Sequence, residues 1–241
     1  MIDSATTLRS IALSQPATIP VFERFGLDYC CGGNRPLAGA CAEKNLDLAA
    51  LLAALAESAN DAAAEPDFTQ ATSAALIDHI VGTHHAYIRS ELPRLESMAA
   101  KVAEKHGPRH PEVFEIQRSF QVLGGDLLQH LHKEEMILFP YISSLERSRD
   151  GQGDPPDACF ASVESPIRMM MMEHETAAGL LEQMRAASKG FTPPPDACPT
   201  FAGLYDGLAA FERDLHRHVH LENNLLFPRA IEMEKGAQLL C

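Results

Sequence analysis

The 241-residue sequence has no tryptophan, few other aromatic residues and no long uninterrupted apolar run. A membrane-spanning helix needs roughly 20 consecutive apolar residues, so no transmembrane segment is expected. The N-terminus lacks the basic and apolar regions of a secretion signal, and we therefore expect a cytoplasmic protein. Basic residues are also scarce, with 20 Lys and Arg against 33 Asp and Glu and a formal charge of −13. This charge argues against nucleic acid and anionic membranes as partners.

Several motifs of other protein classes are missing as well. The sequence contains no Glu-x-x-His pair of the ferritin-like di-iron type, no His-Glu-x-x-His, no Cys-x-x-Cys and no glycine-rich phosphate loop. Alternating segments rich in valine and threonine are absent, which argues against β-strands. The six cysteines are scattered through a mid-sized chain, so a reducing compartment fits better than a disulfide framework.

What the chain does have is histidine, 11 in all, and a duplicated stretch that contains some of them. His130 and Glu134 precede Leu-Phe-Pro, and the same frame recurs with His218 and Glu222. A histidine and a glutamate four residues apart share one helix face and form a metal-ligand pair. A further histidine precedes each copy at nearly the same distance, as expected for a repeat of two helical hairpins. The candidate ligands are His85, His130, Glu134, His174, His218 and Glu222.

The positions of prolines, glycines and a polar linker predict two domains. Residues 1–58 form short helices separated by prolines and by a Cys-Cys-Gly-Gly turn, and Asp47 is a plausible N-cap of the last helix. The polar, alanine-rich residues 57–69 are the predicted linker. Residues 70–241 contain four segments of helical period, roughly 71–105, 111–147, 162–188 and 199–235. The fold class is therefore all-α, an up-and-down four-helix bundle with a small N-terminal helical domain. Prolines 93, 140 and 228 should kink or end these helices.

Apolar stripes indicate which histidines face the bundle interior. Steps of three and four residues from His130 and His218 meet mainly leucine and phenylalanine, and His85 and His174 lie on similar stripes. His84 is a weaker rival of His85. The side chains expected on other faces are His132 and, on a solvated face of the last segment, Arg213, His216, Arg217, His220, Asn223 and Asn224.

Burying these histidines and glutamates without partners would cost roughly 1 to 3 kcal/mol or more for each group. Metal ions would compensate that cost. Imidazole with carboxylate suits iron better than calcium or magnesium, while zinc and manganese stay open. Two shared carboxylates would hold two metals roughly 3.5 to 4 Å apart. A single His-x-x-x-Glu pair is commonly a solvated contact, but its duplication on apolar stripes favours metal. For His85 and His174 the alternative of ordinary core histidines stays open.

Adjacent Cys30 and Cys31 are followed by two glycines that permit a tight turn. Neighbouring cysteines bridge only with strain, so they would act as thiolates on a metal or an oxidant, the alternative being incidental buried residues. The stretch Tyr-Cys-Cys-Gly-Gly with the later Ala-Cys resembles the N-terminal domain of iron-sulfur cluster repair di-iron proteins, the Ric or ScdA-like family. The resemblance continues nearly to the end of the chain through His84-His85, His106-Gly107-x-Arg109-His110-Pro111, Met172-Glu173-His174-Glu175 and both His-x-x-x-Glu copies.

This resemblance implies a hemerythrin-like bundle with two non-haem iron ions, bridged by oxo or hydroxo and by Glu134 and Glu222. It also implies repair of iron-sulfur clusters damaged by nitric oxide or oxidants, through the supply of iron, with Cys30 and Cys31 taking part. Damaged iron-sulfur proteins are then the partners, nitric oxide or oxygen the small ligands, and a homodimer an assembly to consider. The family usually has tyrosine where this chain has His84.

Three other functions compete with this one. The first is a di-iron enzyme that binds or reduces nitric oxide at the same open coordination sites. The second is an oxygen carrier or sensor, although such carriers use a fifth histidine and need no cysteine domain. The third is a metal-free bundle that acts through its surface.

Overall fold

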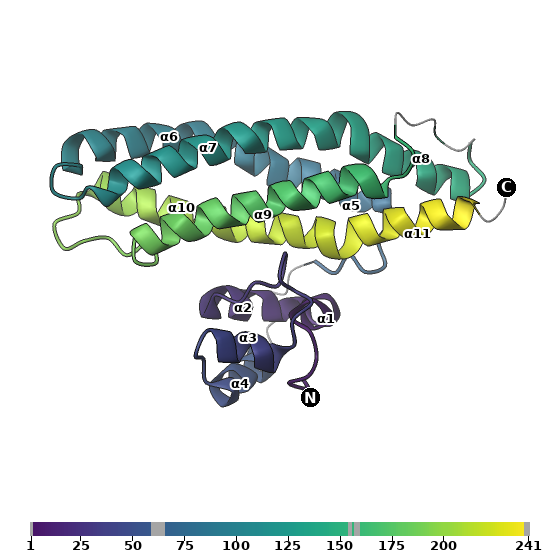
Figure 1. Ribbon diagram of the computed structural model, residues 1–241, viewed down its shortest axis with the longest axis horizontal. Coiled ribbons are helices and arrows are strands. Elements are labelled where there is room, and N and C mark those ends of the chain that lie inside the picture. Colours follow the sequence, from purple (N-terminus) through teal and green to yellow (C-terminus); the bar gives the residue numbers. More distant parts are fainter. Residues whose placement is uncertain (1, 59–65, 154–155, 157–159, 239–241) are drawn as a thin grey trace.

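The structure is a computed structural model that describes residues 2–58, 66–153, 156 and 160–238. Within these ranges the chain is helical, and a single isolated β-bridge joins Thr7 and Pro36 without forming a strand. The all-α prediction is confirmed. Figure 1 shows a long helical bundle with a small helical domain lying against its side.

The small domain consists of short helices around its own apolar core. They are α1 (Leu8–Ser14), η1 (Pro16–Thr18), α2 (Ile19–Phe25), α3 (Leu37–Glu43) and α4 (Leu48–Ser58). Asp47 accepts hydrogen bonds from the amides of Ala49 and Ala50 at 2.8 and 3.4 Å, so it caps α4 as predicted. Phe22, Leu37 and Leu51 are fully buried in this core.

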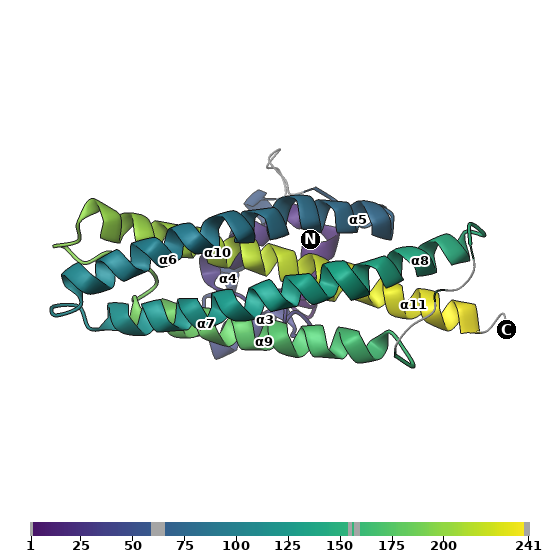
Figure 2. The ribbon, with the colours of Figure 1, turned by 90° about the horizontal axis from the view of Figure 1, so that it is seen from above.

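Four long helical segments build the bundle and run side by side (Figures 1 and 2). They are α5 (Ser73–His79), η2 (Ile80–His85) and α6 (Ala86–His106); α7 (Glu112–Lys133), η3 (Glu134–Leu138) and α8 (Phe139–Arg149); α9 (Glu164–Ala187); and α10 (Pro199–Leu221), η4 (Glu222–Leu226) and α11 (Phe227–Gln238). Their bounds agree within a few residues with the predicted segments. The predicted linker includes residues 59–65, which lie outside the described residues.

Three of the four segments contain a π-helical turn, η2, η3 or η4. At the end of η3 the amide of Phe139 donates to the carbonyl of Glu134, five residues back, and Phe227 does the same with Glu222. A proline follows directly in both cases. Because proline has no N–H to donate, the return from π to α winding leaves no backbone donor without an acceptor at that position. The segments continue across these prolines and do not end at them. Such π turns are common at functional sites.

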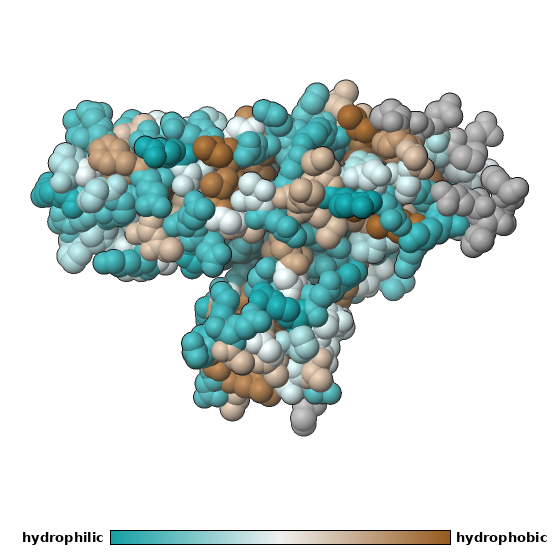
Figure 3. All heavy atoms as spheres, viewed as in Figure 1, coloured by the Kyte–Doolittle hydropathy of each residue, from teal (hydrophilic) through white to brown (hydrophobic). Residues whose placement is uncertain are grey.

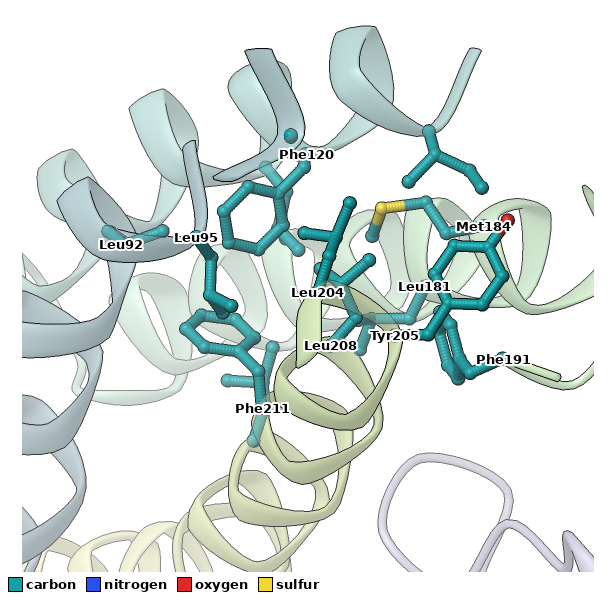
Figure 4. Packing of buried hydrophobic residues seen from close by; sticks show 14 of the residues in the cluster. Leu92, Leu95, Phe120, Leu181, Met184, Phe191, Leu204, Tyr205, Leu208 and Phe211 are labelled. Carbon is teal, nitrogen blue, oxygen red and sulfur yellow. The ribbon is translucent and has the colours of Figure 1, made fainter. Parts of the chain in front are cut away.

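The bundle has two apolar clusters, one on each side of the candidate ligands. The first contains Phe120 and Phe211, whose rings meet edge to face with centroids 5.4 Å apart (Figure 4). The second contains Leu138, Ile167 and Phe227. In each segment the candidate ligands lie between residues of the two clusters or at their border, so a polar layer crosses the apolar interior there.

The small domain contacts the fourth segment of the bundle through polar groups. Arg217 donates to both carboxylate oxygens of Glu23, at 2.8 and 3.0 Å. The side-chain amide of Asn224 donates to the carbonyl of Tyr29 at 3.1 Å. The Tyr29 ring lies edge-on to the ring of His220, with centroids 5.3 Å apart.

These contacts overturn the expectation of a solvated face on the last segment. His220 is only 3% exposed, and Asn223 and Asn224 are buried as well. His216 is partly buried, and burial lowers its pKa. The prediction was wrong for these side chains because the small domain covers them, whereas the periodicity of one helix cannot show what lies against it. His132, by contrast, is exposed, which agrees with its predicted place on another face of the helix.

Figure 3 shows a mainly hydrophilic surface on the viewed face, in keeping with the formal charge of −13. Among the described residues, no helix combines the length and the apolar composition needed to cross a membrane.

Replacement of Phe120 by alanine should lower the free energy of unfolding by about 3 to 5 kcal/mol, because it removes a fully buried ring and leaves a cavity. Urea unfolding followed by circular dichroism measures the change. The matched control is Val122→Ala on the same helix, where the side chain is 48% exposed and the expected loss is under about 1 kcal/mol. Equal losses in both variants would contradict the assignment of the core.

Candidate metal centre

The candidate ligands converge in the polar layer of the bundle from all four segments. Each is buried, with an exposed fraction of 3% or less. They are His85 at the end of η2, His130 in α7, Glu134 at the start of η3, His174 in α9, His218 in α10 and Glu222 at the start of η4. Both glutamates therefore occupy the first position of a π turn.

The six side chains form two groups that share both glutamates. The first group is His85, His218, Glu134 and Glu222, and the second is His130, His174, Glu134 and Glu222, with donor atoms in each group within 4.8 Å of one another. The Nε2 atoms of the paired histidines are 3.1 Å apart in the first group and 3.0 Å apart in the second. Each group thus offers two imidazole nitrogens and two carboxylates to one cation.

Each glutamate directs its two oxygens toward different groups. Glu134 Oε2 is 3.5 Å from His85 Nε2, while its Oε1 is 3.2 Å from His130 Nε2. Glu222 divides its oxygens in the same way. Its Oε1 is 3.0 Å from His218 Nε2 in the first group, and its Oε2 is 3.2 Å from His174 Nε2 in the second. This is the arrangement that a carboxylate needs to bridge two cations.

The buried carboxylates lack enough hydrogen-bond donors. Both oxygens of Glu134 and Oε2 of Glu222 are buried without a hydrogen-bond partner. An unsatisfied buried polar group costs about 1 to 3 kcal/mol, and more when it is charged. Cations between the histidines and carboxylates would remove that cost, so the residues present fit a metal centre.

Three of the four histidines are oriented by an acceptor at Nδ1. The pairs are His85 with Glu135 at 2.6 Å, His130 with Glu173 at 2.8 Å, and His174 with Asn223 at 3.0 Å. An Nδ1–H held in this way leaves the lone pair of Nε2 facing the centre, as in most protein metal sites. Sequence periodicity did not find these acceptors, although Glu135 and Glu173 each adjoin a candidate ligand in the sequence.

His84 does not belong to either group. Its Nδ1 lies 2.9 Å from Asp214 Oδ1, and its ring stacks on that of His218 with centroids 5.7 Å apart. Of the two adjacent histidines, it is His85 whose Nε2 faces the glutamates. The geometry therefore favours His85.

The electrostatics of the centre follow from the burial of opposite charges. Burial lowers the pKa of His130, but the negative charges of Glu134 and Glu222 outweigh it and raise the pKa to about 9. Burial raises the pKa of Glu222, but His218 and His174 hold it well below its ordinary value. Without metal, these shifts favour an ionised Glu222 and a protonated His130 at neutral pH.

A cavity of about 240 Å³ adjoins the second group. Its wall combines the apolar side chains of Leu127, Ala177 and Leu180 with His130 and His174. A small neutral molecule could therefore reach the centre from this side of the bundle. Lys133 and Glu173, which form an ion pair, also line the cavity.

The structure places Cys30 and Cys31 outside both groups. Cys30 is buried and Cys31 is partly exposed, and both are free thiols. Although Cys30 belongs to the small domain, it packs in the first apolar cluster of the bundle. Cys31 Sγ lies 3.9 Å from the side-chain amide of Asn223.

Comparisons with known proteins agree with this architecture. Residues 76–230 match the hemerythrin HHE cation binding domain, and residues 4–59 match ScdA_N, a domain of unknown function. A probable iron-sulfur cluster repair protein of Haemophilus influenzae is 37% identical over 226 residues, which cover 93% of this chain and 96% of that protein. The iron-sulfur cluster repair proteins YtfE of Citrobacter koseri and of Escherichia coli O157:H7 are each 37% identical over 227 residues, covering 94% of this chain and 97% of theirs.

In the metal-free protein, stability should fall as the pH rises from about 6.5 to 9. The folded state holds the pKa of His130 at about 9, above an unfolded value of about 6.5. The stabilisation by the protonated ring is therefore complete below about pH 6.5 and is lost as the pH rises through 9, a change of at most about 3 kcal/mol. Urea unfolding of the chelator-treated protein at both pH values measures it.

His130→Ala and His132→Ala are the matched variants for this measurement, since the second ring is exposed on the same helix. The first variant should lose most of the pH dependence and the second should keep it. An unchanged pH dependence in His130→Ala would show that other groups are responsible.

Proposed function

Since the chain belongs to the hemerythrin HHE cation-binding family, we propose that it repairs damaged iron-sulfur clusters by supplying iron from a di-iron centre. The observation that carries the proposal is the pair of buried histidine groups that share two carboxylates with unsatisfied oxygens. The relatives named as iron-sulfur cluster repair proteins, which match the chain almost from end to end, support the choice of reaction.

We assign two iron ions to this donor set because the relatives are named for the repair of iron-sulfur clusters. Imidazole with carboxylate favours iron over calcium and magnesium, and two carboxylates can be shared between two cations. The proposed ligands are His85 and His218 for one ion, His130 and His174 for the other, and Glu134 and Glu222 for both. When bound, the irons would supply a releasable ion and coordination positions for a small ligand.

The surrounding residues have separate tasks in this proposal. Glu135, Glu173 and Asn223 hold the histidine tautomers that present Nε2 to the ions. The apolar clusters on either side of the polar layer keep water from the carboxylates. The cavity beside His130 and His174 gives access from one side.

The donor set also explains why iron could leave. The centre contains no thiolate, whereas iron-sulfur clusters are held by cysteine thiolates. Transfer to an iron-sulfur protein that has lost iron to nitric oxide or oxidants therefore replaces harder ligands by softer ones. The free cysteines fit a reducing compartment, and we include the cytoplasm in the proposal.

A second candidate function is that of a di-iron enzyme which binds or reduces nitric oxide. The cavity favours it, because a pocket of about 240 Å³ with an apolar wall suits a small neutral ligand. The two functions differ in turnover, since a donor loses its iron and an enzyme retains it.

The first experiment measures iron in protein purified without oxygen, together with optical spectra. We expect two iron ions in the wild type and at most one in His85→Ala, because the first group then has a single histidine. His84→Ala is the matched control and should keep both, since its ring bonds to Asp214. If His84→Ala lost iron and His85→Ala retained it, the ligand assignment would be wrong.

The second experiment mixes the iron-loaded protein with an apo-ferredoxin and sulfide under nitrogen. A donor should restore the ferredoxin spectrum and lose an equal amount of iron. In a separate titration with nitric oxide, it should consume no more nitric oxide than its irons can bind. Glu134→Gln/Glu222→Gln, treated in the same way, should restore nothing because it lacks both bridging carboxylates. Repeated turnover of nitric oxide with full retention of iron would establish the enzyme instead.

A further inference from the structure

The cysteine turn is a second cluster of ligand atoms outside the histidine groups. Asp28 Oδ1 accepts hydrogen bonds from the amides of Cys30 and Cys31 at 3.1 and 2.9 Å, and its Oδ2 accepts one from Gly32 at 2.8 Å. Cys30 Sγ is 3.3 Å from the same Oδ1. The ligand atoms of the aspartate and both cysteines all lie within 4.8 Å of one another.

Glycine is required to hold this turn together. A Cβ atom on Gly32 would lie 2.6 Å from Arg35 Nη2 and 2.7 Å from Asp28 Oδ2, and one on Gly33 would lie 2.5 Å from the carbonyl oxygen of Tyr29. A side chain at Gly32 would displace Arg35 or Asp28, and one at Gly33 would meet the backbone of Tyr29. The close approach of the carboxylate to the two thiols is therefore built into the turn.

The turn also lies close to the metal centre. Asn223 in η4 accepts at Oδ1 from His174 Nδ1 at 3.0 Å, and its Nδ2 is 3.9 Å from Cys31 Sγ. One side chain thus contacts a histidine of the second group and a thiol of the small domain. Cys30 is buried while Cys31 is partly exposed, so the cluster extends from the bundle toward solvent.

Cys30 stays protonated unless a cation takes the place of its proton. The hydrogen bond with Cys31, followed by burial, raises the pKa of Cys30 well above its ordinary value. Two adjacent thiolates beside a carboxylate would repel one another, and a bound cation removes that repulsion.

We propose that Asp28, Cys30 and Cys31 bind one thiophilic divalent cation. Binding breaks two S–H bonds, forms two metal–sulfur bonds and releases two protons to solvent, and the oxidation state of the metal does not change. The identity of the natural cation as ferrous iron, received from the second histidine group, rests on the proposed function. The capacity to bind such a cation does not.

The test uses the full-length metal-free protein and Co²⁺ under nitrogen, because cobalt bound to thiolate absorbs strongly in the near ultraviolet. We expect this absorption to saturate at one equivalent for the thiolate site in the wild type. It should be lost in Cys30→Ala/Cys31→Ala. Cys198→Ala is the matched control, since Cys198 lies at the N-terminus of α10 and contacts His106 instead, and it should keep the absorption.

A further variant separates this site from the histidine groups. Glu134→Gln/Glu222→Gln should keep the thiolate absorption, and its helix content by circular dichroism shows whether it is folded; if it is not, His174→Ala takes its place. No thiolate absorption in the wild type, or equal absorption in Cys30→Ala/Cys31→Ala, would overturn the inference. If the wild type transferred iron to apo-ferredoxin but showed no thiolate absorption with Co²⁺, the proposed function would stand and the thiolate site would fail. If it showed the absorption but transferred no iron, the thiolate site would stand and the proposed function would fail.

Discussion

The burial of two carboxylates among four imidazoles is the constraint on which this structure depends. Neither Glu134 nor Glu222 reaches solvent, and three of their four oxygens have no hydrogen-bond donor. Such a layer persists inside a bundle only when the charges compensate one another, through protonated histidine in the absence of metal and through cations in their presence. The apolar clusters on both sides hold the four segments at the spacing that this compensation needs.

The π turn η4 connects that layer to the small domain. Glu222, Asn223 and Asn224 are consecutive, yet they contact three different partners. The glutamate faces the histidines, Asn223 lies between His174 and a cysteine, and Asn224 donates to a carbonyl of the small domain. A displacement of this turn would therefore move residues of the centre and of the domain contact together.

Local patterns predicted much of the fold and of the candidate site. The duplicated His-x-x-x-Glu frame marked His130 and Glu134 with their counterparts, and apolar periodicity located the four segments within a few residues. The same method failed at His220 and Asn224, since it assigns polar residues to solvent when no partner is visible in the same helix. It also missed Glu135 and Glu173, whose histidine partners lie 50 and 43 residues away in the sequence.

The sequence by itself determined the helical class, the four segments and the six candidate ligands, because period and repetition are local properties of a chain. Only the tertiary structure decided that His85 and not His84 faces the glutamates, that each glutamate divides its oxygens between two histidine pairs, and that the cysteine turn lies against Asn223. Those features depend on how the segments are rotated and packed against one another, and on contacts between residues as far apart as Cys31 and Asn223, which no local pattern encodes.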